Sequence, residues 1–149
     1  MECNNISKIH DCYGCGLCSA SCGKKVISIE LNRDGFYEPR INCGICLDVC
    51  AFNHEERALK DEEIHIKSWA AYSNDEEVRR KCSSGGIGFE IGKQLIEQGY
   101  HAVGCRYDIK EQRAEHYIAT TVEDFVQSIG SKYIQSYTEK AFKKINRKG

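Results

Sequence analysis

The sequence carries almost no excess of charge of either sign. Its 149 residues include 21 Lys and Arg against 22 Asp and Glu, which gives a formal net charge of -1 at pH 7. A basic footprint for polynucleotides is therefore missing, and so is the strongly acidic composition of a disordered chain. We expect a globular protein that has no nucleic acid as a partner.

Long apolar runs are also missing. No stretch approaches the length that a bilayer-spanning helix needs, and the opening residues, MECNNISKIHD, lack the basic start and apolar centre of a signal peptide. The sequence therefore predicts a cytoplasmic protein without membrane insertion.

Cysteine, in contrast, is abundant, with ten residues in the chain. In a reducing compartment these thiols stay reduced, and clustered cysteines then indicate metal binding rather than disulfides. Most of them lie between Cys12 and Cys50. The others, Cys3, Cys82 and Cys105, are scattered, and we expect them to be ordinary core or surface thiols.

The first cysteine run, HDCYGCGLCSASCGKK, has the spacing C-x2-C-x2-C-x3-C. Bacterial ferredoxins hold 4Fe-4S clusters with this spacing, and in two-cluster ferredoxins the fourth cysteine of each run binds the other cluster. A second run, RINCGICLDVCAF, repeats the pattern in part. The first cluster is therefore predicted to have a full set of thiolate ligands: Cys12, Cys15, Cys18 and Cys50.

The second cluster is predicted to be incomplete. Its thiolates are Cys22, Cys43 and Cys46, and alignment backwards from Cys50 places Arg40 where the fourth ligand belongs. Because arginine is cationic, it is a poor iron ligand. The spacing therefore allows a 3Fe-4S cluster, a labile 4Fe-4S cluster with an outside ligand, or an empty site.

The chain has a single proline, and it follows neither cysteine run; Gly23 and Ala51 stand after Cys22 and Cys50 instead. Proline there would restrict the backbone that leaves the cluster, so its loss loosens the loop without removing a ligand. Zinc is the alternative metal, since it also takes four thiolates. Zinc ribbons, however, usually present two separated C-x2-C pairs rather than a triple run.

Between the cysteine runs, VISIELNRDGFYEPRI predicts a β-hairpin with NRDG as its turn. Residues 53–66 are charged and contain neither Gly nor Pro, which favours a short solvated helix between two modules. We therefore predict an α+β protein with two domains. Residues 1–66 form a two-cluster ferredoxin-like module, and residues 67–149 form an incomplete α/β domain.

The second half alternates helical and extended patterns. We predict strands at SWAAYS, HAVGCRYD and RAEHYIATT, and helices at DEEVRRK, IGFEIGKQLIEQGY, VEDFVQSIG and TEKAFKKINRK. Ile87, Ile91, Leu95 and Ile96 share one face of the second of these helices. Gly99 is placed to cap its C-terminus, and Thr121 to open the helix that follows. The alternation stops where another buried strand would be needed, so we expect a truncated domain.

The loop CSSGGIG precedes the longest predicted helix. Its backbone amides and the helix dipole suit the phosphate of a flavin or a nucleotide. The alternative is a local role, in which Ser83 or Ser84 caps the helix and the glycines form a tight turn. Neither a Walker motif nor a dinucleotide fingerprint is present.

Taken together, the double cysteine run, the segment AAYSNDEEVRRKCSSGGIGFEIGKQLIEQGYHAVGCRYD and the stretch SKYIQS resemble the coenzyme F420 hydrogenase/dehydrogenase beta-subunit family. The resemblance covers nearly the whole chain. It implies an iron-sulfur module that exchanges electrons with a flavin, FAD in a full-length member, and a redox partner protein or subunit. The residues that it implies on the flavin side are Ser83, Ser84, Gly85, Gly86, Ser131, Lys132 and Tyr133.

The preferred hypothesis is thus an iron-sulfur electron-transfer protein or subunit of a flavin-dependent oxidoreductase. No catalytic acid, base or nucleophile is identifiable from the sequence, because its Tyr, Lys and His residues share no motif. The alternative is a non-catalytic metal-binding fragment that holds zinc or one structural cluster.

Overall fold

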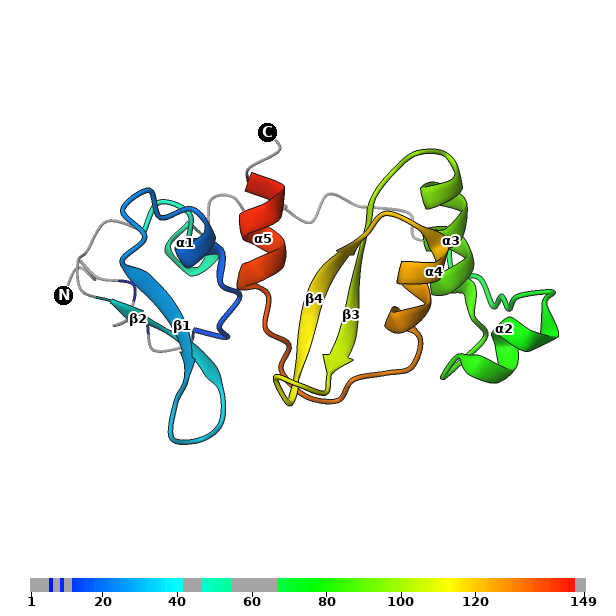
Figure 1. Ribbon diagram of the computed structural model, residues 1–149, viewed down its shortest axis with the longest axis horizontal. Helices are drawn as coiled ribbons and strands as arrows, with labels where there is room; N and C mark the ends of the chain where they lie inside the picture. Colours follow the sequence, from blue (N-terminus) through cyan, green and yellow to red (C-terminus); the bar gives the residue numbers. More distant parts are fainter. Residues whose placement is uncertain (1–5, 7–8, 10–11, 42–46, 55–66, 147–149) are drawn as a thin grey trace. The chain divides into compact units, whose positions relative to one another are not determined.

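A computed structural model describes residues 6, 9, 12–41, 47–54 and 67–146 of the chain. The chain divides into two compact units (Figure 1). The first unit comprises Met1–Glu62 together with Tyr137–Gly149, and the second comprises Glu63–Ser136. The ferredoxin-type and α/β assignments of residues 1–66 and 67–149 stay predictions.

The first unit contains the predicted hairpin. Strand β1 (Ile27–Leu31) pairs antiparallel with β2 (Tyr37–Ile41), and Ile29 lies opposite Pro39. Asn32 closes the turn, because its side-chain oxygen accepts hydrogen bonds from the N–H groups of Asp34 and Phe36, both at 2.9 Å. Gly35 takes the left-handed conformation that the turn requires, with φ of 83°. The hairpin prediction is confirmed.

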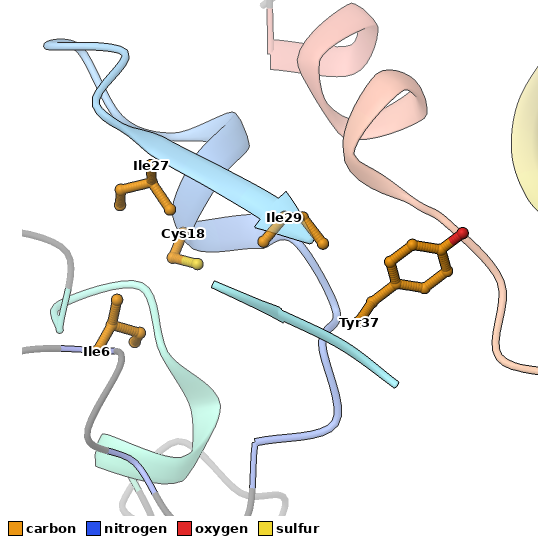
Figure 2. Packing of buried hydrophobic residues seen from close by; sticks show 5 residues of the cluster. All are labelled: Ile6, Cys18, Ile27, Ile29 and Tyr37. Carbon is orange, nitrogen blue, oxygen red and sulfur yellow. The ribbon is translucent and has the colours of Figure 1, made fainter. Parts of the chain in front are cut away.

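One face of this hairpin packs on the first cysteine run. The short helix α1 (Leu17–Ala20) begins two residues after Cys15, and its Cys18 lies among the buried side chains of the unit. Figure 2 shows the five members of this cluster: Ile6, Cys18, Ile27, Ile29 and Tyr37. A predicted metal-binding cysteine is thus also part of the hydrophobic core.

The C-terminal helix α5 (Glu139–Asn146) belongs to the first unit and packs on α1. Its Glu139 is buried and accepts hydrogen bonds from Ser19, Tyr137 and Lys143. Burial works to raise the pKa of Glu139, but these three hydrogen bonds outweigh it and leave the pKa below its ordinary value of 4.5. A charged carboxylate therefore joins α5 to α1.

The second unit begins with two helices on either side of the glycine loop. Asp75 caps α2 (Glu76–Lys81) by accepting from the N–H groups of Glu77 and Val78. Helix α3 (Ile87–Glu97) ends at the predicted place, where Gly99 has φ of 91° and its N–H bonds the carbonyl of Ile96.

A second hairpin follows, in which β3 (Ala102–Asp108) pairs antiparallel with β4 (Arg113–Ala119). After it come α4 (Val122–Phe125) and the 3-10 helix η4 (Val126–Ser128). Thr121 caps α4 through a 3.2 Å hydrogen bond from the Asp124 N–H, as predicted. Helices α3 and α4 pack together beside this hairpin (Figure 1).

The core of the second unit lies where α3 and α4 approach each other closely. A Cβ on Gly92 would lie 2.2 Å from Phe125 Cε1, so only glycine fits there without a shift. Phe125 also stacks on Phe89, with ring centroids 5.6 Å apart and an interplanar angle of 10°. Ile96, Tyr117 and Ala119 complete this core.

The prediction for the apolar face of α3 was only partly right. Ile96 is 8% exposed, but Ile91 is 55% and Leu95 is 42% exposed. The buried face instead follows Phe89, Gly92 and Ile96, which are spaced i, i+3 and i+7. The reason is that Gly92, which adds nothing to hydrophobicity, is where the helix meets Phe125.

The predicted strand at SWAAYS is wrong. Residues 68–73 form no strand, and the N–H of Ser73 instead bonds the carbonyl of Gly85 in the glycine loop at 2.7 Å. Residues 55–66, where a linking helix is predicted, lie outside the described residues.

The fold class is α+β, as predicted. Both sheets in the described part of the chain are two-stranded and antiparallel, and short helices accompany each of them. Among these residues, no helix is both long and apolar enough to cross a membrane.

Candidate functional site

Four cysteines line one small pocket in the first unit, which we call the thiol pocket. They are Cys12, Cys15, Cys18 and Cys50, and the other walls include Tyr13, Pro39 and Phe52. The free volume between these side chains is about 30 Å³, and it is mostly apolar. The structure therefore brings Cys50 from the second run to the three leading cysteines of the first run.

Local contacts shape the loop that carries these thiols. Gly16 opens α1 with φ of 76°, and a Cβ there would lie 2.9 Å from Thr138 Oγ1. The Thr138 hydroxyl donates a hydrogen bond to the carbonyl of Cys15. The start of α5 thus holds the cysteine loop in place.

The thiols of this pocket interact electrostatically. Burial raises the pKa of the Cys12 thiol, and a hydrogen bond from the Gly14 N–H to its sulfur, at 3.4 Å, works in the opposite direction. Negative charge on Cys15 and Cys50 would raise the pKa of Cys12 further. A cationic centre among them would reverse this balance, because it stabilises thiolates.

The donor set fits a 4Fe-4S cluster, which takes one thiolate on each iron, and backbone amides such as that of Gly14 are typical partners of its sulfur ligands. Within the described ranges, no three His, Cys, Asp or Glu side chains converge as the ligands of a single metal ion would. The cysteines in those ranges are free thiols rather than disulfides.

Cys22 does not line the thiol pocket, although it packs against the same core cluster as Cys18 and Cys50. It lines a different hollow of about 310 Å³, together with Lys25 and Lys143. Arg40 is exposed on β2, next to Pro39, which lines the thiol pocket. Since neighbouring residues of a strand face opposite sides, Arg40 points away from the thiol pocket. Cys43 and Cys46 lie outside the described residues, so the second cluster stays a prediction.

The second unit contains a much larger pocket, of about 600 Å³, which we call the loop pocket. The glycine loop and the N-terminus of α3 contribute Ser83, Ser84 and Gly86, and the later stretch contributes Ser131 and Lys132. Five of the seven residues that the resemblance implies for a flavin therefore line one pocket.

A direct hydrogen bond joins the two stretches. The N–H of Ser131 donates to the hydroxyl oxygen of Ser83 at 2.8 Å. Gly86 has φ of 81° at the start of α3, and no side chain caps this helix. The free N–H groups of the first turn of α3 thus lie at the loop pocket, where Gly88 also forms part of the wall.

Lys132 is held by the backbone of its own segment. Its ammonium group donates to the carbonyls of Gln127, Ser128, Ile129 and Gly130 at distances from 2.7 to 3.4 Å. These are the carbonyls at the end of η4, where a positive charge is favourable. Among the described lining residues, none is acidic, and Lys132 carries the only full charge at pH 7.

The other two predicted residues do not line the loop pocket. A Cβ on Gly85 would lie 2.7 Å from the carbonyl oxygen of Ala71, so this glycine permits close packing of the loop on residues 71–73. Tyr133 is 92% exposed.

The structure also places residues in the loop pocket to which the sequence assigned no binding role. Cys105 on β3 and His116 on β4 lie opposite each other in the hairpin, and both line the pocket with Ser136. Cys82 and the stacked Phe89 and Phe125 complete the walls. The predicted hairpin contained the signal for the pair, because a four-residue turn after Asp108 sets Cys105 across from His116.

These polar groups are connected by hydrogen bonds. Cys105 Sγ lies 3.3 Å from Ser136 Oγ, and His116 Nδ1 lies 2.8 Å from the same oxygen. Burial lowers the pKa of His116 below its ordinary value of 6.5, so the imidazole is neutral at pH 7. The pocket therefore combines a glycine loop, hydroxyl groups, an aromatic wall and a neutral imidazole.

The fold and the two pockets define an α+β protein with a cysteine-rich unit and a pocket that serines and glycines line. A family model described as coenzyme F420 hydrogenase/dehydrogenase, beta subunit N-term, matches residues 68–143. The chain therefore belongs to this family, as the sequence resemblance predicted. No curated protein matches the chain.

Proposed function

We propose that this chain is an iron-sulfur electron-transfer subunit of a flavin-dependent oxidoreductase. In this proposal the thiol pocket holds a 4Fe-4S cluster and the loop pocket binds a flavin nucleotide, FAD in the first instance. When they are bound, the cluster supplies one-electron transfer and the flavin supplies hydride chemistry.

The observation that carries the proposal is the composition of the thiol pocket. Cys12, Cys15 and Cys18 share it with Cys50, which comes from the other run. This crossing is the arrangement by which two-cluster ferredoxins complete each ligand set. Proximity in sequence does not explain this grouping, since Cys50 is far from Cys18 in the sequence.

The chain's own residues tune such a site in two ways. Apolar neighbours, among them Ile29 and Pro39, form part of the wall of the thiol pocket and lower the local polarity around its sulfur atoms. The Gly14 N–H donates to the sulfur of Cys12 and thereby stabilises negative charge on it. Burial disfavours charge and the amide favours it, so together they set the reduction potential of a bound cluster.

The second site is proposed with Cys22, Cys43 and Cys46, and with Arg40 in place of a fourth ligand. A 3Fe-4S cluster suits three thiolates, whereas a 4Fe-4S cluster needs a further ligand from outside. Lys25 and Lys143 near Cys22 would favour the negative charge of a thiolate-ligated cluster.

The loop pocket has the properties of a flavin nucleotide site. Its volume lies within the usual range for small-molecule pockets, roughly 300 to 1,000 Å³. Phosphates suit the uncapped start of α3, the serine hydroxyls and Lys132, since no acidic side chain lies in the described lining. Phe89, Phe125 and the isoleucines of the wall suit an aromatic ring.

A redox partner follows from the same proposal. The family is that of a beta subunit, so electrons enter or leave through another protein or subunit. The chain's proposed role is to relay electrons between that partner and the flavin acceptor, in the cytoplasm.

The test is a measurement of iron and acid-labile sulfide per chain after anaerobic purification, with EPR spectra before and after reduction by dithionite. We expect at least four irons and four sulfides, and a signal that changes on reduction. Cys50→Ala should lose the first cluster, although Cys50 lies outside the leading cysteine run.

Cys82→Ala is the matched control, because it removes a half-buried cysteine of the second unit and should keep the full iron content. Zinc without sulfide would overturn the redox proposal and would support a non-catalytic metal-binding fragment instead. Equal iron loss in both variants would show that the effect is not specific to the thiol pocket.

A further inference from the structure

A chain of hydrogen bonds runs along one wall of the loop pocket. Cys105 and His116 face each other across the β3–β4 hairpin, and Ser136 lies between their polar atoms. The Sγ–Oγ distance is 3.3 Å and the Oγ–Nδ1 distance is 2.8 Å. All three side chains are half-buried and line the pocket.

The two hydrogen bonds that join Cys105, Ser136 and His116 have a preferred donor direction. The Cys105 thiol donates to Ser136 Oγ, which leaves the serine proton free to donate to His116 Nδ1. An imidazole nitrogen is a much stronger acceptor than a thiol sulfur, so the serine hydroxyl is best used in this way. The ring then carries its own proton on Nε2, which is also the intrinsically favoured tautomer of histidine.

The Nε2 atom of His116 is the free end of this series of hydrogen bonds. Within the described part of the protein, no residue hydrogen-bonds it, although the ring lines the pocket. A neutral ring with Nδ1 engaged can only donate through Nε2. The wall therefore presents one directed donor to whatever occupies the pocket.

We propose that Cys105 and Ser136 hold His116 as an Nε2–H donor for an acceptor atom on the ring of the bound cofactor. This inference rests on the proposed flavin function and extends it by assigning the ring end of the ligand to this wall. Cys105 and Ser136 are positioning residues, and His116 is the residue that touches the ligand.

The residues that line the loop pocket distinguish a part that suits a phosphate group from a part that suits an aromatic ring. Phosphate needs positive charge or several N–H donors, which the start of α3 and Lys132 supply. The imidazole is neutral because burial lowers the pKa of His116, so it adds no charge for a phosphate. A single neutral donor instead suits a carbonyl oxygen or a ring nitrogen of a heteroaromatic group.

The tautomer is tested first, in the protein without flavin. Side-chain nitrogen NMR at pH 7.5 should show the His116 proton on Nε2 and an acceptor-type Nδ1. Ser136→Ala should instead give the averaged signals of a mixture of the two His116 tautomers. Ser136→Thr and Cys105→Ser, which keep a hydroxyl donor, should preserve the wild-type signals. A proton on Nδ1 in the wild type would overturn the proposed direction.

Ligand contact is tested with three probes: FAD; riboflavin, which keeps the isoalloxazine ring but lacks phosphate; and ADP, which keeps the phosphates and the adenine but lacks the isoalloxazine ring. His116→Phe should weaken FAD and riboflavin binding by about tenfold, the loss expected for one good hydrogen bond, and should leave ADP binding unchanged. His116→Gln, which keeps an N–H donor, should restore most of the affinity. His101→Phe is the matched control, since His101 is exposed and outside the pocket.

The outcomes separate this inference from the proposed function. If the wild type binds none of the probes, the flavin function fails and the ligand contact fails with it, whatever the tautomer. If the wild type binds FAD but His116→Phe binds it equally well, or loses ADP to the same extent, only the assignment of His116 to the ring fails.

Discussion

Ser131 donates its backbone N–H to the hydroxyl oxygen of Ser83 at 2.8 Å, across 48 residues of sequence. This bond joins the glycine loop to the SKY stretch and closes one side of the loop pocket. It shows how two short motifs that are far apart in the chain come to line the same pocket, because each supplies a part of one wall.

Ser83→Ala should therefore weaken FAD binding more than it weakens folding. The hydrogen bond is exposed to solvent, so its loss should reduce the free energy of unfolding by at most about 1 kcal/mol. The pocket wall, in contrast, loses its link, and we expect FAD affinity to fall by about three- to tenfold. Urea unfolding and fluorescence titration with FAD measure the two effects.

Ser28→Ala is the control for this variant. Its hydroxyl also makes an exposed hydrogen bond, to Glu30 in the first unit. It should leave FAD affinity unchanged; an equal loss in the two variants would contradict a specific role for the link between Ser83 and Ser131.

The packing of α3 on Phe125 predicts opposite effects for two glycines of the same helix. Gly92→Ala places a methyl group 2.2 Å from the buried Phe125 ring and should destabilise the protein by about 1 to 3 kcal/mol. Gly88→Ala meets nothing within 4 Å and should stabilise it by up to about 1 kcal/mol, through better helix propensity. Thermal unfolding of both variants gives the comparison, and equal shifts would contradict this packing.

The lowered pKa of Glu139 predicts that the protein loses stability in acid. The pKa of Glu139 in the folded protein lies below its ordinary value of 4.5. The ionised carboxylate therefore contributes its full stabilisation of the folded state at pH values above 4.5. The contribution is lost as the pH falls through the lower, folded pKa, where the buried carboxylate takes up a proton. Glu139→Gln should cost about 1 to 2 kcal/mol at pH 7 and much less at pH 3.

The matched control is Glu30→Gln, since Glu30 also accepts a serine hydroxyl but in an exposed position. Its unfolding free energy should follow that of the wild type at both pH values. A Glu139→Gln variant with the same loss at pH 3 and pH 7 would show that the charge of Glu139 is not what joins α5 to α1.

Arg40→Cys tests the incomplete second cluster. If Arg40 stands in place of a ligand, a thiolate there should raise the iron content per chain and convert a three-iron EPR signal into that of a reduced 4Fe-4S cluster. Arg33→Cys adds an exposed thiol in the hairpin turn and should leave the iron content unchanged. An unchanged iron content in Arg40→Cys would remove Arg40 from the site.

Much of the secondary structure was predictable because its signals are local. Asp75 and Thr121 cap helices through their own neighbours, Asn32 closes a turn two to four residues away, and Gly99 ends a helix by its backbone conformation alone. The strand predicted at residues 68–73 failed because extended backbone needs a partner. Its Ser73 N–H found the carbonyl of Gly85 in the glycine loop, not a strand.

The sequence by itself determined the candidate ligands: the spacing of Cys12, Cys15 and Cys18, and the serine and glycine loop at the start of α3. Spacing along a chain is enough for this, because neighbouring residues stay close in any fold. Only the tertiary structure decided which distant groups meet, namely Cys50 with the first run, and Cys105, His116 and Ser136 on one wall. The meeting of Cys105 with His116 depends on strand register. The packing of Phe125 on α3 depends on the close contact that Gly92 allows, which leaves no hydrophobic pattern in the sequence.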